Sequence, residues 1–216
     1  METQDGLIGG DVFADFLLTL DFPGRMLKLD PLPTLPDAAP GTETLTLATG
    51  TQSGLDKPIR DRYIAPSMKD WTKVFRSGHD LIMPVFLNDS PPRLFIIDTG
   101  SSLNLISWQL AKEIGKVSKG SNVRLTGISG EVKQTYTTGP LTLTFARLQQ
   151  KTDGLVGMDT SSLGRNSGTN IVGLIGAPTL HQLTMQIDYR DDLMNFTYDE
   201  KRLTRCVSNA RLADCY

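Results

Sequence analysis

Short apolar runs, separated by clusters of Gly, Pro, Asn, Asp and Ser, dominate the chain. Such runs are typical of β-strands joined by turns. The runs that predict strands are Phe16–Phe22, Leu45–Leu47, Leu81–Leu87, Leu94–Ile97, Val132–Tyr136, Leu141–Phe145, Ile171–Ile175 and Leu183–Tyr189. One segment, Trp108–Ile114, predicts a helix, because Ser107 can cap its N-terminus and Gly115 can end it. The pattern therefore predicts an all-β protein with little helix.

An internal repeat relates the beginning of the chain to a segment near its end. Gly6-Leu7-Ile8-Gly9 recurs 167 residues later as Gly173-Leu174-Ile175-Gly176. The apolar pattern keeps this offset as far as Leu29 and Phe196. Each copy predicts an apolar strand ending in Gly, a short helix, an alternating strand, a turn and a second strand. We interpret the two copies as a duplication, in which the first copy is the end of an earlier lobe.

Composition and charge narrow the class of function. The 216 residues carry a formal net charge of −2, with a pI of about 5.7, so the charge pattern of a nucleic-acid-binding protein is missing. No run of about 18 apolar residues predicts a membrane span. Two histidines are too few for a histidine-rich metal site.

The two cysteines, Cys206 and Cys215, lie close together near the C-terminal end of the chain. They either form a disulfide that closes a small loop or are two unrelated thiols. A disulfide would favour an oxidising, extracytoplasmic compartment.

The residue that we expect to carry chemistry is Asp98. The continuous apolar run Leu94–Ile97 predicts a strand buried on both faces, and it leads directly into Asp98-Thr99-Gly100-Ser101-Ser102. A carboxylate at the end of a buried strand needs hydrogen-bond donors, because desolvation of an unpaired charge is costly. The hydroxyl groups of Thr99 and Ser101 can donate, and Gly100 allows close approach of the backbone. Taken alone, Asp-Thr-Gly would also fit an ordinary turn.

In combination with the segments around it, this motif resembles the aspartic peptidases, in particular the retropepsin-like families of bacteria. Phe95–Ser102 matches their apolar strand running into Asp-Thr-Gly, and a strand and a helix follow at residues 103–115. Thr126–Glu131 matches their glycine-rich flap hairpin. Gly173–Phe196 matches the closing strand, helix and hairpin. Asp153–Gly157 also resembles the closing motif, but the alternating strand follows Gly176.

The resemblance implies a retropepsin-like closed β-barrel lobe, the acid protease fold, with one short helix after the Asp-Thr-Gly strand and another after the closing strand. It divides the chain into four parts. These are a C-terminal remnant of a first lobe (1–30), a linker and insertion (31–78), a complete lobe (79–200) and a C-terminal tail (201–216).

The activity implied by the resemblance is that of an aspartic endopeptidase. Asp98 would be the catalytic residue, supported by Thr99, Gly100 and Ser101, with Ser101 donating to Asp98 and Thr99 bonding across a lobe interface. The flap residues Gly127, Ile128, Ser129 and Gly130 would cover an extended peptide substrate. No metal or other cofactor is expected.

The chain contains one Asp-Thr-Gly, whereas the implied mechanism needs two aspartates. The second would come from an N-terminal lobe that precedes this chain or from a homodimer partner. Three alternatives remain: a non-catalytic peptidase-like module that binds extended peptides by strand addition, a purely structural β module, and an ATPase of the sugar kinase or actin type.

Overall fold

The computed structural model describes residues 8–36, 62–114, 117–119, 126–127, 130–131, 136–161, 163 and 168–202. Strands predominate in these residues, which confirms the all-β prediction. The strands are β1 (Phe16–Asp21), β2 (Met26–Pro31), β3 (Thr72–Lys73), β4 (Phe75–Ser77), β5 (Asp80–Leu87), β6 (Arg93–Ile97), β7 (Leu105–Ser107), β8 (Val117–Lys119), β9 (Thr126–Gly127), β10 (Gly130–Glu131), β11 (Tyr136–Thr138), β12 (Leu141–Phe145), β13 (Leu148–Thr152), β14 (Val156–Met158), β15 (Ile171–Ile175), β16 (Leu183–Asp188) and β17 (Leu193–Tyr198). The helices are α1 (Trp108–Ile114), α2 (Ala177–Leu180) and two short 3-10 helices, η1 (Gly10–Phe13) and η2 (Pro66–Met68).

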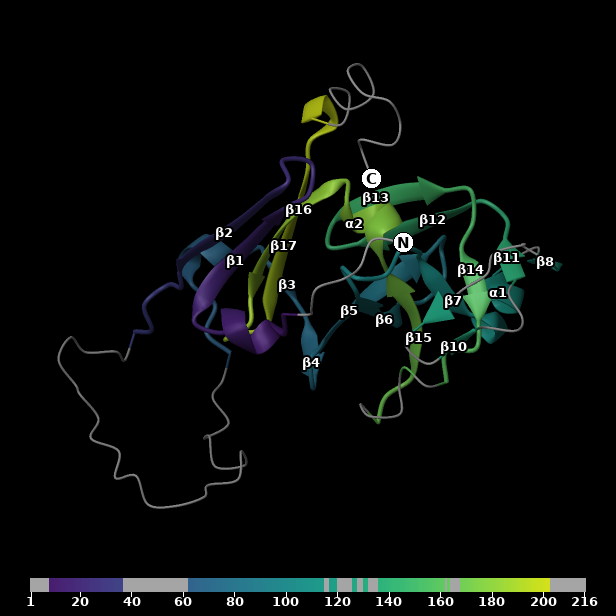
Figure 1. Cartoon of the computed structure of the whole chain (residues 1–216), viewed down its shortest axis with the longest axis horizontal. Coiled ribbons are helices and arrows are strands. Elements are labelled where there is room, and N and C mark those ends of the chain that lie inside the picture. Colours follow the sequence, from purple (N-terminus) through teal and green to yellow (C-terminus); the bar gives the residue numbers. More distant parts are fainter. Residues whose placement is uncertain are drawn as a thin grey trace.

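Two sheets build most of the molecule, as Figure 1 shows. The ten-stranded sheet has the order β13-β12-β5-β6-β15-β7-β14-β11-β8, with β4 also paired to β5. The five-stranded sheet has the order β2-β1-β16-β17-β3. Within the described residues, the larger sheet is open, because its two end strands, β13 and β8, do not pair with each other. The closed barrel implied by the resemblance is therefore not formed by these strands.

Strand β6 lies near the middle of the ten-stranded sheet, between β5 and β15. Its side chains Phe95 and Ile96 are both buried, and they belong to apolar clusters on opposite faces of the sheet. The continuous apolar run is thus explained by burial on both faces, as predicted. β15 runs parallel to β6, so Ile175 lies beside Ile97 at the end where the Asp-Thr-Gly loop begins.

Helix α1 has the bounds that its sequence predicted. The Ser107 hydroxyl accepts a hydrogen bond of 3.2 Å from the N–H of Leu110, which caps the first turn. Leu110 and Ala111 are buried against the sheet. Local capping and an apolar face were enough to define this helix.

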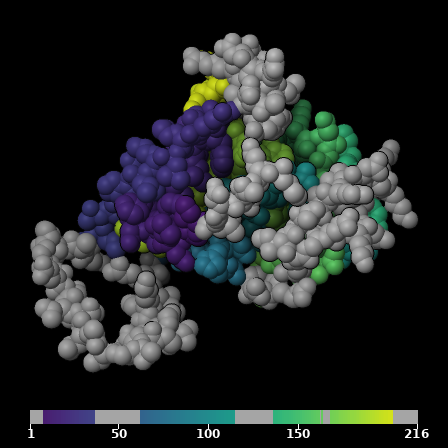
Figure 2. Space-filling model, viewed as in Figure 1, coloured from purple at the N-terminus to yellow at the C-terminus, as the bar shows by residue number. Residues whose placement is uncertain are grey.

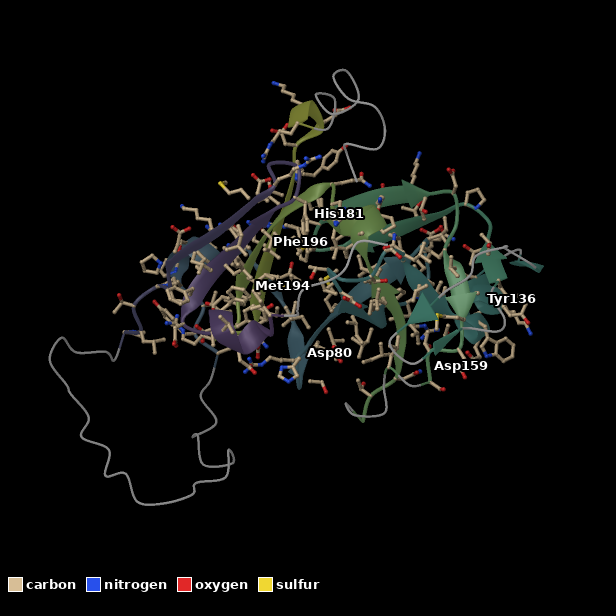
Figure 3. The ribbon with its side chains drawn as sticks, viewed as in Figure 1. Asp80, Tyr136, Asp159, His181, Met194 and Phe196 are labelled. Carbon is tan, nitrogen blue, oxygen red and sulfur yellow. The ribbon has the colours of Figure 1, made fainter. Side chains whose placement is uncertain are left out.

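The main apolar core fills the space between the two sheets, and Figure 3 labels Met194 and Phe196 there. Phe196 on β17 packs edge-on against Phe145 on β12, with ring centroids 5.7 Å apart. The opposite face of β17 is covered by residues 63–71, because Leu193 packs against Ala65 and Met68. Residues 62–73 therefore belong to the five-stranded sheet: residues 63–71 cover one face of β17, and β3 pairs with its edge.

The five-stranded sheet contains two hairpins, β1–β2 and β16–β17, whose residues correspond at the offset of 167. The 3-10 helix η1 and the helix α2, which precede them, correspond at the same offset. Both turns begin at an aspartate: the last strand pair is Asp21↔Met26 in the first hairpin and Asp188↔Leu193 in the second. Each aspartate accepts a hydrogen bond from a backbone N–H three residues later, of Gly24 at 3.1 Å and of Asp191 at 3.0 Å. The next residue in each turn has a positive φ, 50° at Arg25 and 52° at Asp192.

The two hairpins also pair with each other symmetrically. β1 and β16 are antiparallel, with Thr19 opposite Gln186 at the centre. These two residues are themselves separated by 167 positions, so exchanging the hairpins leaves the pairing unchanged. A local two-fold axis therefore passes between Thr19 and Gln186.

Candidate active site

Asp98 is the first residue after β6, and its side chain is partly buried. Its Oδ1 accepts a hydrogen bond of 2.9 Å from the backbone N–H of Gly100. Its own N–H donates to the carbonyl of Ile175 at 3.0 Å, which continues the β6–β15 pairing by one residue. The carboxylate is therefore held at the end of a buried strand while remaining accessible to solvent.

The loop that follows Asp98 is bound to the segment that closes the lobe. The N–H of Ala177, at the start of α2, donates to the carbonyl of Ser101 at 2.8 Å. The buried Asn104 accepts the N–H of Gly176 at 2.8 Å and donates to the Thr179 hydroxyl at 2.9 Å. These bonds fix the loop from both of its ends. Asn104 has no motif signal in the sequence, because only the fold brings it to Gly176.

Two glycines of the closing segment allow this close contact. A Cβ atom on Gly176 would lie 2.7 Å from the carbonyl oxygen of Ser101 and would also overlap that of Leu103. A Cβ on Gly173 would overlap the ring of Phe95 and lie 2.6 Å from the Leu105 carbonyl oxygen. Gly176 thus allows the backbone of Ser101 and Leu103 to approach, whereas Gly173 allows β15 to pack against Phe95 in β6 and Leu105 in β7.

Ser101 differs from its expected role. Its hydroxyl donates to the carbonyl of Leu103 at 2.9 Å, rather than to Asp98. The reason is local geometry: a serine in this turn reaches the carbonyl two residues ahead more easily than a carboxylate three residues behind. The hydrogen bond to Asp98 comes instead from the backbone of Gly100. Thr99 is exposed at the surface of the loop.

Asp80 is a second carboxylate near Asp98, and the sequence analysis missed it. β5 and β6 are antiparallel with Leu81 opposite Ile97, so the next step along the two chains brings Asp80 level with Asp98. Partial burial and the negative charge of Asp98 raise the pKa of Asp80 above its ordinary value, while nearby His79 lowers it. No sequence motif links Asp80 to Asp98, because only the pairing of β5 with β6 makes them neighbours. Figure 3 labels Asp80 near the end of the β4–β5 hairpin.

His79, at the tip of that hairpin, lies close to the N-terminal segment. Its Nδ1 is 3.6 Å from a carboxylate oxygen of Asp11, in η1. Asp80 is thus a carboxylate close to Asp98, and His79 joins the same hairpin to Asp11 in η1.

A family model described as aspartyl protease matches residues 83–178 of this chain. The matched segment begins within β5, contains Asp98 and the loop bound to it, and ends in α2. Residues 83–178 belong to the aspartyl protease family. The resemblance to retropepsin-like aspartic peptidases, which rested on the Asp-Thr-Gly motif and its flanking segments, is thereby confirmed.

Two solved structures show similarity to parts of this chain. The EIAV protease, in complex with the inhibitor HBY-793, is 20% identical with a TM-score of 0.37, over 49% of this chain and 89% of that one. A retropepsin-like aspartic protease from Rickettsia conorii is 15% identical with a TM-score of 0.34, over 59% of this chain and 89% of that one. No curated protein matches the sequence.

The segment expected to form a flap, Thr126–Glu131, contains the paired strands β9 and β10, with Gly127 opposite Gly130. Ile128 and Ser129 lie outside the described residues. So do Cys206 and Cys215, and the question of a disulfide between them stays open.

No group of three or more His, Cys, Asp or Glu side chains suited to a metal ion occurs in the described part of the chain. Among the same residues, no helix is long and apolar enough to span a membrane.

Proposed function

We propose that this chain supplies one half of an aspartic endopeptidase, with Asp98 as its catalytic carboxylate. The observation that carries this proposal is the position of Asp98 inside the aspartyl protease match, at the end of a buried strand and in a loop bound at both ends. A substrate-facing carboxylate held by backbone rather than by flexible side chains is preorganised for catalysis.

The reaction would be the hydrolysis of a peptide bond by a water molecule held between Asp98 and a second aspartate. Two carboxylates about 3 Å apart cannot both ionise, so the pair shares one proton. The ionised member takes a proton from the water, and the protonated member donates a hydrogen bond to the scissile carbonyl. The second aspartate would come from a preceding lobe or from another copy of the chain.

The remaining site residues would act around this pair. Thr99, exposed beside Asp98, would bond across the interface with the second lobe. The β9–β10 hairpin would act as a flap that covers an extended peptide and excludes water. Gly100 donates the backbone bond that orients Asp98, and Ser101 stabilises the turn.

We also infer that residues 79–200 form a complete lobe and that the segment up to residue 30 is the end of another. The equal hairpin registers, the equal positive φ values and the local two-fold axis support a duplication. Residues 62–78 pack with the complete lobe, so the linker part of the proposed 31–78 segment would be the stretch before them.

The test compares Asp98→Asn with Asp89→Asn in the full-length protein. Asp89 is an exposed carboxylate in the loop between β5 and β6, so its loss serves as a matched control. We expect Asp98→Asn to lower casein hydrolysis about 10²–10⁴-fold at acidic and at neutral pH, because Asn keeps the shape and loses the titrating group. Circular dichroism checks that both variants fold. Unchanged turnover in a folded Asp98→Asn variant would exclude the proposed role.

A further inference from the structure

The β4–β5 hairpin places an exposed carboxylate, that of Asp80, beside Asp98. Leu81 lies opposite Ile97 in the pairing of β5 with β6, so Asp80 comes level with Asp98. Side chains directly opposite each other in an antiparallel pair share one face of the sheet, with Cβ atoms about 5 Å apart. Burial and the negative charge of Asp98 raise the pKa of Asp80, which agrees with this proximity.

An exposed aromatic ring, that of Phe75, lies on the same face of the sheet. Strand β4 pairs with β5, with Ser77 opposite Asp80 and Phe75 opposite Ile82. Phe75 is therefore the diagonal neighbour of Asp80, at a spacing that aromatic and long side chains can reach across. Its side chain is 58% exposed, whereas Val74, the preceding residue, is fully buried in the main core. Figure 2 shows the β4–β5 hairpin, in blue, at the surface of the molecule.

The basic side chains of this hairpin do not form an ion pair with Asp80. Arg76 lies on the opposite face of β4, with its Nε 3.7 Å from Asp192. The Nδ1 of His79 lies 3.6 Å from a carboxylate oxygen of Asp11. Within the described ranges, Asp80 is in none of the ion pairs and in none of the side-chain hydrogen bonds, so its carboxylate is available to a ligand.

Lysine and arginine side chains have the chemistry that fits this pair of residues. Each has an apolar stem, which packs against an exposed ring such as that of Phe75, and a terminal positive charge, which an aromatic face also attracts. A carboxylate at the end of that stem stabilises the charge. An acidic side chain in the same place would instead meet the repulsion of Asp80 and Asp98.

We propose that Asp80 and Phe75 are specificity-determining residues, which favour peptide substrates with Lys or Arg next to the scissile bond. This inference rests on the proposed function, since it takes the scissile bond to lie at Asp98. A side chain bound to Asp80 belongs to a residue that flanks this bond, because Asp80 and Asp98 are direct neighbours across the strand pair. The carboxylate selects the charge, and the ring contacts the stem.

The first measurement identifies the bonds that the full-length protein cleaves in casein, by mass spectrometry of the products. We expect Lys or Arg to flank the cleaved bonds severalfold more often than they flank all the bonds of casein. Cleavage without this enrichment overturns the inference and leaves the proposed function standing. The absence of any cleavage overturns both.

The second measurement assigns the preference to Asp80. Two synthetic peptides reproduce the most rapidly cleaved casein site and differ only in Lys or norleucine, which has the same stem without the amino group. The ratio of their kcat/KM values should be about five in the unsubstituted protein, the size of one exposed ion pair, and about one in Asp80→Asn. Asp80→Lys should bring the ratio below one.

Asp89→Asn is the matched control, because Asp89 is an exposed carboxylate in the loop after β5 and its loss should leave the ratio at about five. A general defect in folding or catalysis lowers kcat/KM for both peptides equally, so the ratio is insensitive to it. A ratio that Asp80→Asn does not change contradicts the role of Asp80.

The role of Phe75 is tested by comparing Phe75→Ala with Phe86→Ala. Phe86 is also an exposed ring on β5, 42% exposed, but it lies toward the other end of that strand. Because Lys and norleucine share the same stem, Phe75→Ala should raise KM for both peptides about threefold with kcat unchanged, whereas Phe86→Ala should change neither constant. An unchanged KM in Phe75→Ala, or an equal increase in Phe86→Ala, contradicts the role of Phe75.

Discussion

The hairpins β1–β2 and β16–β17 have the same strand register and the same turn, yet equivalent side chains are exposed in the first and buried in the second. The first exposes Leu27 and Leu29 where the second buries Met194 and Phe196. The aspartates that begin the two turns differ as well. The hydrogen bond from Arg202, 2.7 Å from Asp21, lowers the pKa of Asp21, whereas burial raises the pKa of Asp188.

This difference shows that the local sequence determines the path of a hairpin, whereas the packed neighbours determine its energetics. Both turns use an aspartate whose side chain accepts backbone N–H groups, a feature that short-range geometry explains. Among the described residues, the buried Oδ2 of Asp188 has no hydrogen-bond partner. Leu17 lies opposite Asp188 where Thr184, which donates to Asp21, lies opposite Asp21. Substitutions at equivalent positions therefore separate the two contributions.

The largest expected contrast is between Met194→Ala and Leu27→Ala. Met194 is fully buried in the main core, so truncation leaves a cavity and lowers the free energy of unfolding by about 3 kcal/mol. Leu27→Ala removes a half-exposed side chain and should cost less than about 1 kcal/mol in the 216-residue chain. Urea unfolding of both variants measures the difference, and equal losses would contradict the contrast in burial.

The next contrast is between Gly176→Ala and Gly9→Ala. A Cβ at Gly176 meets backbone oxygens that cannot move independently, so we expect a loss of about 2 kcal/mol of unfolding free energy. Gly9 has nothing within 4 Å of its Cβ position, and its φ of −74° and ψ of 156° suit alanine. Gly9→Ala should therefore change stability by no more than about 0.5 kcal/mol. Thermal melts of both variants in the same buffer measure the two changes. An equal or larger loss of stability for Gly9→Ala would contradict the difference in packing around the two glycines.

The smallest contrast, and the one with opposite signs, is between Asp21→Asn and Asp188→Asn. The pKa of Asp21 is lowered, so its stabilisation is present above the ordinary value of 3.8 and is lost as the pH falls through the folded-state pKa. The pKa of Asp188 is raised, so its contribution is greatest below 3.8 and is lost as the pH rises through the folded-state pKa. At pH 7, we expect Asp21→Asn to destabilise by about 1–2 kcal/mol and Asp188→Asn to stabilise by about 1 kcal/mol.

Denaturant unfolding at several pH values tests these signs. For each variant, the difference in unfolding free energy from the unsubstituted chain should shrink as the pH is lowered toward 3. At low pH the aspartates become neutral, so that each resembles the asparagine that replaces it. Destabilisation by Asp188→Asn at pH 7 would mean that its ionised form is compensated in the folded protein.

The sequence by itself determined the elements whose signals are local. The apolar run before Asp98 identified β6, the capping serine and apolar face identified α1, and the offset of 167 identified two hairpins with one pattern. The Asp-Thr-Gly motif and its flanking segments identified the aspartyl protease family. Each element is indicated by residues within a few positions of one another, and the repeat and the family resemblance compare or combine such local patterns. No long-range contact was needed to find them.

The tertiary structure alone decided what lies far apart in the chain. The strand β13 has a polar sequence and follows a turn in which Ala146 and Arg147 have positive φ, so packing against β12 defines it rather than turn or strand propensity. Asn104 reaches Gly176, and Asp80 comes level with Asp98, only through strand pairing across the sheet. The sequence assigned one pattern to both hairpins, but burial is a property of what is packed against a surface. For that reason only the folded chain distinguishes the covered hairpin from the exposed one.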